Sequence, residues 1–216
     1  GLKDHSNDEL SAIMAGKKVG VGFSMTDRFF LLSGNTNRED LETQLQLQTA
    51  YLMHPGYRQD GVTLLRRAIP MIYNKMDHEV QGAMKKQVPA ILYRNNPRFT
   101  FPTQEQLTSY QIKDVRDWVD APLKNNYMEV TVTGDFRTED IIPLLERTVG
   151  AVPKRAEAPA TLDETLRHPA MADFNFSKDL TYDSSIDKTM VCLFWKTPGG
   201  ENKKLARRLN RSEERR

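Results

Sequence analysis

The sequence predicts a chain of mixed strands and helices, because two kinds of apolar periodicity follow one another along its 216 residues. Period-two runs typical of strands occur at 19–23 and 127–133, and 28–33 is a short run rich in large apolar groups. Stripes at helical spacing fill much of the chain between them. The expected order is two strands, four helices, a strand and a helix, then a linker, two strands and the start of a helix. A content of 38% hydrophobic and 28% charged residues is that of an ordinary folded protein.

Helix starts are marked by Ser or Thr followed three positions later by Glu or Gln, the capping-box pattern. The pattern occurs at Ser6, Thr36 and Thr103, and Gly16 is expected to end the first short helix. Proline lacks the N–H of an interior helical hydrogen bond, so we expect an interruption or bend at Pro70. The main helices are expected at 41–52, 60–76, 80–93, 112–119 and 139–149, with Val115 and Trp118 on the buried side of the fourth.

The expected strands fall into two groups. Residues 19–23 and 28–33 are close enough to form a hairpin, and YMEVTVT at 127–133 has the clearest alternation in the chain. A polar strand at 176–182 and an apolar one at 189–195 are expected further on. The single cysteine, Cys192, excludes an internal disulfide and is expected to be a small buried hydrophobe.

The character of the chain changes after Gly150, where Ala, Pro, Lys and Glu dominate without a sustained period. We predict a domain at 1–153, a linker at 154–174 and an incomplete second domain at 175–216. The opening GLKDHSNDEL is polar and lacks Met, which suggests a piece of a longer protein. A net charge of +2 gives no reason to expect nucleic acid, and no apolar run approaches the roughly 20 residues that a membrane span needs.

The pair His78-Glu79 raises the question of a zinc site. The protease motif HExxH works because two histidines four apart share one zinc ion on one face of a helix. The residue four after His78 is Gly82, and the inverted motif HxxEH does not occur in the sequence. The other histidines, His5, His54 and His168, are scattered, so neither catalytic nor metal-binding residues are predicted in this chain, and no cofactor.

Other catalytic motifs are also missing from the sequence. Gly20 and Gly22 start a G-x-G, but Met25 stands at the third glycine and a strand follows, whereas dinucleotide binding needs a helix there. No phosphate-binding Walker loop and no nucleophile elbow occur. Gly134-Asp135 is either a site at a strand end or a turn that precedes a helix, and we favour the turn. From residues alone the function is not revealed.

Three stretches carry a resemblance to a known family: LSGNTNREDLETQLQLQTAYLMHPGYR, EVTVTGDFRTEDIIPLLERTVGAVPKR and KTMVCLFWKT. Together they resemble zinc metallopeptidases of the insulinase/pitrilysin (inverzincin) type, in the order that this family has them. The chain looks like the third domain and the start of the fourth, in the non-catalytic C-terminal half. The charged ending RRLNRSEERR departs from the apolar helix that the family has there.

The resemblance implies an α+β two-layer sandwich, with helices on one face of a mainly antiparallel sheet as in mitochondrial processing peptidase, followed by a partial second copy. It implies a substrate-enclosing segment, a peptide substrate, and zinc in the N-terminal domain of the parent protein rather than in this segment. The zinc-bearing half of the same protein would be its partner, without membrane insertion. Substrate-binding residues cannot be named from the sequence.

An alternative is a catalytically inactive structural or binding subunit with the same fold, and a third is an unrelated α/β ligand-binding protein. An upstream HxxEH motif in the same gene would favour the peptidase, and a complete gene without it would favour the inactive subunit. A periplasmic or otherwise extracytoplasmic location is expected from the resemblance alone.

Overall fold

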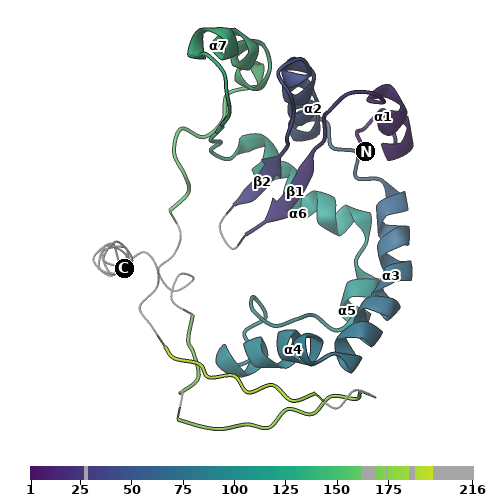
Figure 1. Ribbon diagram of the computed structural model, residues 1–216, viewed down its shortest axis with the longest axis vertical. Helices are drawn as coiled ribbons and strands as arrows, with labels where there is room; N and C mark the ends of the chain where they lie inside the picture. Colours follow the sequence, from purple (N-terminus) through teal and green to yellow (C-terminus); the bar gives the residue numbers. More distant parts are fainter. Residues whose placement is uncertain (27–28, 162–168, 174, 185–187, 197–216) are drawn as a thin grey trace. The chain divides into compact units, whose positions relative to one another are not determined.

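The computed structural model describes residues 1–26, 29–161, 169–173, 175–184 and 188–196 (Figure 1). Helices dominate these residues, with one two-stranded antiparallel sheet. The elements are α1 (Asn7–Ile13), β1 (Gly22–Met25), β2 (Phe30–Ser33), α2 (Leu41–Met53), α3 (Gln59–His78), α4 (Val80–Leu92), α5 (Gln104–Ser109), α6 (Ile112–Asn125), α7 (Thr138–Arg147) and a 3-10 turn η1 (Val149–Ala151). None of these helices is long and apolar enough to cross a membrane.

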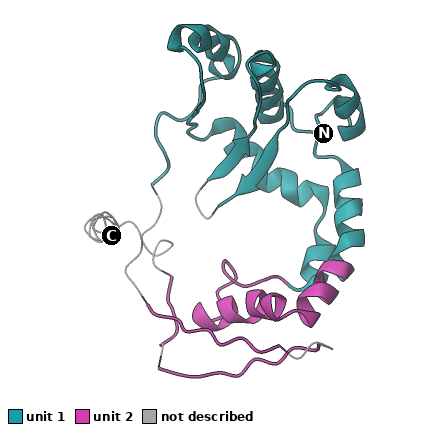
Figure 2. Ribbon diagram, in the orientation of Figure 1, with its two compact units in different colours: residues 1–70, 103–167 teal, residues 71–102, 168–216 magenta. Residues whose placement is uncertain are grey.

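The chain divides into two compact units (Figure 2). Unit 1 comprises Gly1–Pro70 and Thr103–Arg167, and unit 2 comprises Met71–Pro102 and His168–Arg216. The boundary falls within α3, which continues through Pro70. Of the interruption or bend expected there, the interruption is therefore wrong and the bend stays a prediction. The domain limits inferred from the sequence stay a prediction.

The predicted hairpin is confirmed in unit 1. β1 and β2 pair antiparallel, with Phe23 opposite Leu32 and Met25 opposite Phe30. β1 begins later than expected, at Gly22, because the backbone of Gly20 is bound by a glutamine side chain of α2. The first strand is therefore shorter than its alternating pattern.

Two of the three predicted capping boxes are confirmed. Ser6 caps α1 together with Glu9, and Thr103 caps α5 together with Gln106. The box expected at Thr36 is wrong, because α2 begins only after Asp40. There the side chain of Asn37 accepts the Asp40 N–H at 2.8 Å and forms a turn ahead of the helix.

Two small apolar clusters hold unit 1 together. Leu2, Leu10 and Leu47 form the first, with Tyr51 among the side chains packed against it. The second consists of Leu52 of α2 with Val119 and Leu123 of α6, and is covered by Phe30, Leu32, Tyr57, Met128 and Val152. The second cluster joins the sheet, α2 and α6 into one body.

The expected buried face of α6 is wrong. Val115 is 42% exposed and Trp118 is 59% exposed, whereas Val119 and Leu123 are each 6% exposed. α6 extends to Asn125, beyond the predicted end at 119, and its i, i+4 pair Val119–Leu123 is the one that reaches α2. Trp118 therefore projects towards the surface.

The strands expected at 127–133, 176–182 and 189–195 are not strands in the structure. An alternating sequence becomes a strand only when a neighbouring backbone accepts its hydrogen bonds, and among the described residues these segments have no ladder partner. Met128 still packs against the second cluster of unit 1. Cys192, expected to be buried, is exposed.

Unit 2 is organised around α4 and the end of α3. Gly82 of α4 lies so close to the backbone of Met76 that an added Cβ would stand 2.3 Å from the Met76 Cα. The hydroxyl of the buried Tyr73 donates a short hydrogen bond to the Pro102 carbonyl, and its ring packs on Phe101. The loop predicted at 95–103 is confirmed as irregular.

The segment after η1 is fastened to the end of α6. The Arg155 guanidinium donates to the carbonyls of Leu123 and Asn126, and the Ala156 N–H donates to Asn125 at 2.9 Å. Residues 162–168, in the middle of the predicted linker, lie outside the described residues. So do the helix expected after Pro198 and the charged ending.

Candidate functional site

The surroundings of His78 do not fit a zinc ion. His78 is the last residue of α3 and Glu79 precedes α4, so the pair stands at a break between two helices. The His78 Nδ1 lies 2.7 Å from the Asn74 carbonyl, and its Nε2 lies 3.7 Å from the Asp183 carboxylate. Nowhere in the described part of the chain do three His, Cys, Asp or Glu residues gather in metal-binding geometry. The donor groups around His78 therefore hold the helix end and do not form a ligand set.

The glycine positions that suggested sites have structural roles. Gly20 is held by Gln44, and Gly22 belongs to a hairpin, so no helix N-terminus follows them to receive a pyrophosphate. Gly134 has φ 151°, a backbone conformation that favours glycine, in the bend before α7. The turn interpretation at Gly134-Asp135 agrees with this bend. His168, the fourth histidine, lies outside the described residues.

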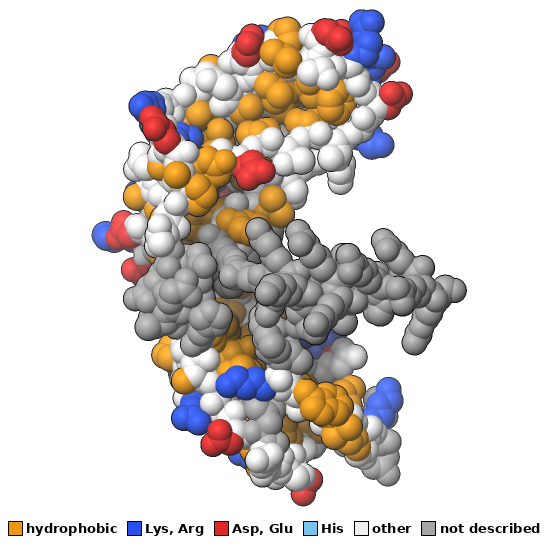
Figure 3. Space-filling model, turned by 90° about the vertical axis from the view of Figure 1, so that its left-hand side faces the viewer, with side chains coloured by type: hydrophobic (Ala, Val, Ile, Leu, Met, Phe, Trp, Pro, Cys, Tyr) orange, Lys and Arg blue, Asp and Glu red, His pale blue; other side chains and the backbone are white. Residues whose placement is uncertain are grey.

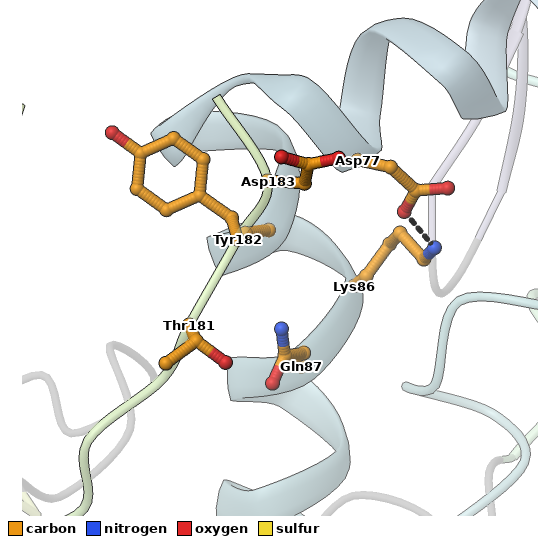
Figure 4. A pocket seen from close by; sticks show the side chains of 7 residues that line it. Asp77, Lys86, Gln87, Thr181, Tyr182 and Asp183 are labelled. Carbon is orange, nitrogen blue, oxygen red and sulfur yellow. Dashed lines mark hydrogen bonds and ion pairs between the residues drawn. The ribbon is translucent and has the colours of Figure 1, made fainter. Parts of the chain in front are cut away.

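A small polar cavity of about 220 Å³ lies within unit 2 (Figure 4). Asp77 lines it from α3, and Lys86 and Gln87 line it from α4. Thr181 and Tyr182 line it from residues 175–184, which are neither helix nor strand. The Lys86 ammonium forms an ion pair with Asp77 and stands 5.4 Å from the centre of the Tyr73 ring. Lys86 and Asp77 neutralise each other. We therefore interpret the cavity as a gap in the packing of α4 against residues 175–184 and not as a catalytic centre.

Tyr57, in the HPGYR stretch that carries the resemblance, closes the turn between α2 and α3. Its φ of 42° is unusual for a non-glycine residue, and its ring packs on the second cluster of unit 1. The Arg116 guanidinium lies 5.5 Å from the ring centre. Burial, followed by the nearby Asp120 carboxylate, raises the pKa of Tyr57 to about 12, so the phenol stays neutral at physiological pH. The residue acts in the fold and not as an acid or base.

An exposed aromatic surface lies on one side of the hairpin. The Phe30 ring is 5.6 Å from the Phe23 ring and 5.7 Å from the Trp118 ring, centre to centre, the second pair edge to face. Phe23 is 47% exposed and Met25 is 51% exposed. We call Phe23, Met25, Phe30 and Trp118 the aromatic face. Figure 3 shows that hydrophobic side chains gather at several places on the side of the molecule that it presents.

The aromatic face is the best candidate for a functional surface in unit 1. Large apolar groups left at a surface mark contacts with other molecules, and Trp, Phe and Met are enriched at such contacts. This surface was missed at the level of sequence because Trp118 was assigned to the core. The signal that could have found it was the alternation within β1, which puts Phe23 and Met25 on one side of the hairpin. Phe30 lies on the same side, because it stands opposite Met25 in the strand pairing.

Comparisons with known proteins agree with the resemblance. A family profile described as "Peptidase M16 inactive domain" matches residues 109–210. The chloroplastic stromal processing peptidase of Pisum sativum is 21% identical over 138 residues, which are 63% of this chain and 11% of that protein. The Arabidopsis thaliana protein of the same name is 20% identical over 140 residues, 64% of this chain and 11% of that protein.

A solved structure has the same fold. A mutant of the ferredoxin protease FusC, crystallised in complex with Arabidopsis ferredoxin, superposes with a TM-score of 0.56 at 16% identity. The match covers 75% of this chain and 18% of that one, and the chain spans about a tenth of the length of the curated relatives. The inactive-domain match and these relatives support the M16, insulinase-type peptidase family for this chain, and within that family its non-catalytic C-terminal part.

Proposed function

We propose that this chain is a substrate-enclosing segment of a zinc metalloendopeptidase. It would contribute a binding surface for the peptide but no catalytic residue. The observation that carries the proposal is the aromatic face, in which Phe23, Met25 and Trp118 are exposed beside the half-buried Phe30, in a chain that resembles a peptidase family. Enclosing a polypeptide needs such a surface, because apolar burial is the largest general source of affinity for unfolded chains.

Zinc and the hydrolytic steps would belong to another part of the parent protein. The sequence has no HxxEH motif, and the geometry at His78 offers no ligand set. In the parent, a zinc-bound water would attack the peptide carbonyl with a glutamate as base. The partner of this segment is then the zinc-bearing half of the same protein, and its substrate is a polypeptide. The complex of FusC with ferredoxin supports a protein substrate for that enzyme, and by analogy for the parent of this chain.

The complete architecture is part of the same proposal. We infer a two-layer sandwich for the first domain and a partial second copy after the linker. The TM-score to FusC supports a common fold, and the family profile extends to residue 210.

The test is complementation between two separately purified parts. The chain alone and the zinc-bearing half of its gene product are assayed for zinc content and for cleavage of an unfolded polypeptide, apart and then mixed. Activity in the mixture alone supports the proposal. Cleavage or stoichiometric zinc in this chain alone contradicts it.

An inactive structural or binding subunit is the second candidate, favoured by the description of the matched family domain as inactive. A complete gene without the zinc motif, and no activity in any mixture, would establish it. The extracytoplasmic location stays a prediction from the resemblance. Fractionation of the source cells with an antibody against the chain tests it.

A further inference from the structure

We propose that residues 188–196 bind an anionic lipid surface, with Val191, Leu193 and Trp195 at the level of the headgroups. This contact lies beyond the proposed function, because it belongs to unit 2 and its ligand is not a polypeptide. The contact is peripheral: none of the described helices could cross a bilayer.

The segment is extended and has one strongly exposed side. Figure 1 shows it as a yellow stretch without helical turns, so successive side chains point to opposite sides. On one side Val191 is 83% exposed, Leu193 71% and Trp195 74%. On the other side Met190 and Phe194 are each 43% exposed. We call the three side chains of the first side the apolar row.

The start of the segment is fastened to the rest of unit 2. The Tyr182 hydroxyl donates to the Lys188 carbonyl at 2.6 Å. Tyr182 itself lines the small cavity beside Lys86 and Gln87 of α4 (Figure 4). The apolar row therefore belongs to a folded unit and is anchored next to one of its ends.

A lysine stands at each end of the apolar row. Lys188 and Lys196 are exposed, and the seven residues between them include no acidic side chain. The two lysines are eight positions apart, roughly 26 Å in an extended chain. Anionic headgroups form a continuous surface, so both ammonium groups meet negative charge there without any fixed spacing. Trp and Lys are also residues that segments at a membrane surface favour.

The charges favour a lipid surface over a second copy of the chain. Antiparallel pairing centred on Cys192 would place Lys188 of one copy opposite Lys196 of the other, and parallel pairing would align each lysine with its own copy. Like charges that face each other across paired strands are destabilising. An unfolded polypeptide could cover the apolar row, but it has no general reason to be anionic at both ends. A lipid surface accommodates the apolar row and both lysines together.

The experiment uses the full chain and vesicles of equimolar phosphatidylcholine and phosphatidylserine. Trp118 and Trp195 are the two tryptophans of the chain, so Trp118→Phe leaves Trp195 as the reporter. Its fluorescence is expected to shift to the blue and to saturate as vesicles are added. In Trp195→Phe the fluorescence of Trp118 is expected to stay unchanged. Vesicles of phosphatidylcholine alone are expected to bind roughly 25-fold more weakly, since each lysine near an anionic surface contributes about fivefold.

Protein variants test the apolar row and the lysines, with binding measured by sedimentation with the vesicles. Leu193→Ala is expected to weaken binding roughly tenfold through lost apolar burial, and Lys188→Gln and Lys196→Gln about fivefold each. Leu64→Ala is the matched control, because Leu64 is 65% exposed on α3, outside the segment. Circular dichroism checks that each variant folds, and Val191→Ala replaces Leu193→Ala if that variant does not.

Four results would overturn the lipid contact. They are no saturable binding of the vesicles, equal binding with and without phosphatidylserine, a blue shift of Trp118 in place of Trp195, and a loss in Leu64→Ala as large as in Leu193→Ala.

The two alternative occupants are tested beside the vesicles. A reduced and alkylated polypeptide is added to the Trp195 reporter, and the oligomeric state of the free chain is measured by analytical ultracentrifugation. A response to the polypeptide without vesicle binding, or a dimer that Leu193→Ala abolishes without vesicle binding, would overturn the lipid contact and assign the apolar row to that occupant. Complementation is assayed without vesicles, so failure of the lipid contact and failure of the peptidase role are distinguishable.

Discussion

The side-chain amide of Gln44 pairs with the backbone of Gly20 as a neighbouring strand would. Its Oε1 accepts the Gly20 N–H and its Nε2 donates to the Gly20 carbonyl, both at 2.9 Å. Gln44 is 3% exposed whereas Gly20 is exposed, so both bonds are partly buried. The contact joins α2 to the segment that leads into β1, and it satisfies backbone groups that the short hairpin leaves unpaired.

Replacing Gln44 by alanine should therefore lower the free energy of unfolding by about 2 kcal/mol or more, since a buried polar group left unpaired costs about 1–3 kcal/mol. Denaturant unfolding followed by circular dichroism measures the change. The control is Gln46→Ala, the same substitution on an exposed position of α2. Equal effects of the two variants would contradict the importance of the pairing.

Gly34 should not tolerate alanine. An added Cβ would stand 2.2 Å from Gln44 Nε2 and 2.6 Å from the Gly20 carbonyl oxygen, and one of these is backbone that cannot move away. We expect destabilisation of about 1–3 kcal/mol, as for other overpacked sites. Thermal unfolding measures it.

Gly61→Ala is the matched control for this substitution. Gly61 lies in α3 with nothing within 4 Å of an added Cβ. Alanine there should raise stability by up to about 1 kcal/mol through helix propensity. A loss at Gly61 comparable to the loss at Gly34 would show that crowding is not the cause.

The fold should lose stability in alkali through Tyr57. The pKa of Tyr57 is raised to about 12 from the ordinary 10.0, mainly by burial. A raised folded-state pKa means a contribution that is complete below pH 10 and is lost as the pH rises towards 12. The ultraviolet absorbance of tyrosinate should show late titration of Tyr57 and also of Tyr51, whose pKa is raised by burial.

Tyr57→Phe should remove the contribution of Tyr57 to this late titration and leave that of Tyr51. The fall of the melting temperature between pH 10 and 12 should become shallower in this variant. Tyr110→Phe is the comparison, because Tyr110 is 52% exposed. If Tyr110→Phe removed the late titration instead, the assignment to Tyr57 would fail.

Arg155→Ala should loosen the segment that follows η1. The guanidinium holds the carbonyls of Leu123 and Asn126 at the end of α6, where helix carbonyls lack partners. We expect a loss of about 1.5–3 kcal/mol, the usual range for hydrogen bonds to a charged group. Faster hydrogen exchange of the Ala156 amide, which bonds to Asn125, should accompany it.

Lys154→Ala is the neighbouring control, since Lys154 is exposed and forms its ion pair with Glu157, away from the end of α6. Unchanged exchange at Ala156 in Arg155→Ala would contradict the role of the guanidinium.

Features that depend on neighbours in the chain were predictable. The capping boxes at Ser6 and Thr103 need only residues three apart, and the hairpin needs only two short strands and a turn between them. The box at Thr36 failed because Asn37 binds the Asp40 N–H and postpones the helix. Local competition of this kind is not visible in a motif.

Features that depend on distant partners were not predictable. Trp118 and Val119 are adjacent apolar residues, and which of them is buried depends on where α2 lies, with Leu52 against Val119. The segment 127–133 alternates as a strand should, but alternation sets only the faces of a strand and cannot supply its hydrogen-bond partner.

The sequence by itself determined the succession of helices, the hairpin, the absence of a zinc motif and, through its resemblance, the family. Only the tertiary structure decided that the exposed Phe23, Met25 and Trp118 gather around the half-buried Phe30, beside an edge of β1 that has no ladder neighbour among the described residues. The physical reason is that helix starts and turns are set by groups a few residues apart. A surface and the unpaired edge next to it exist only once distant segments have packed and left them uncovered.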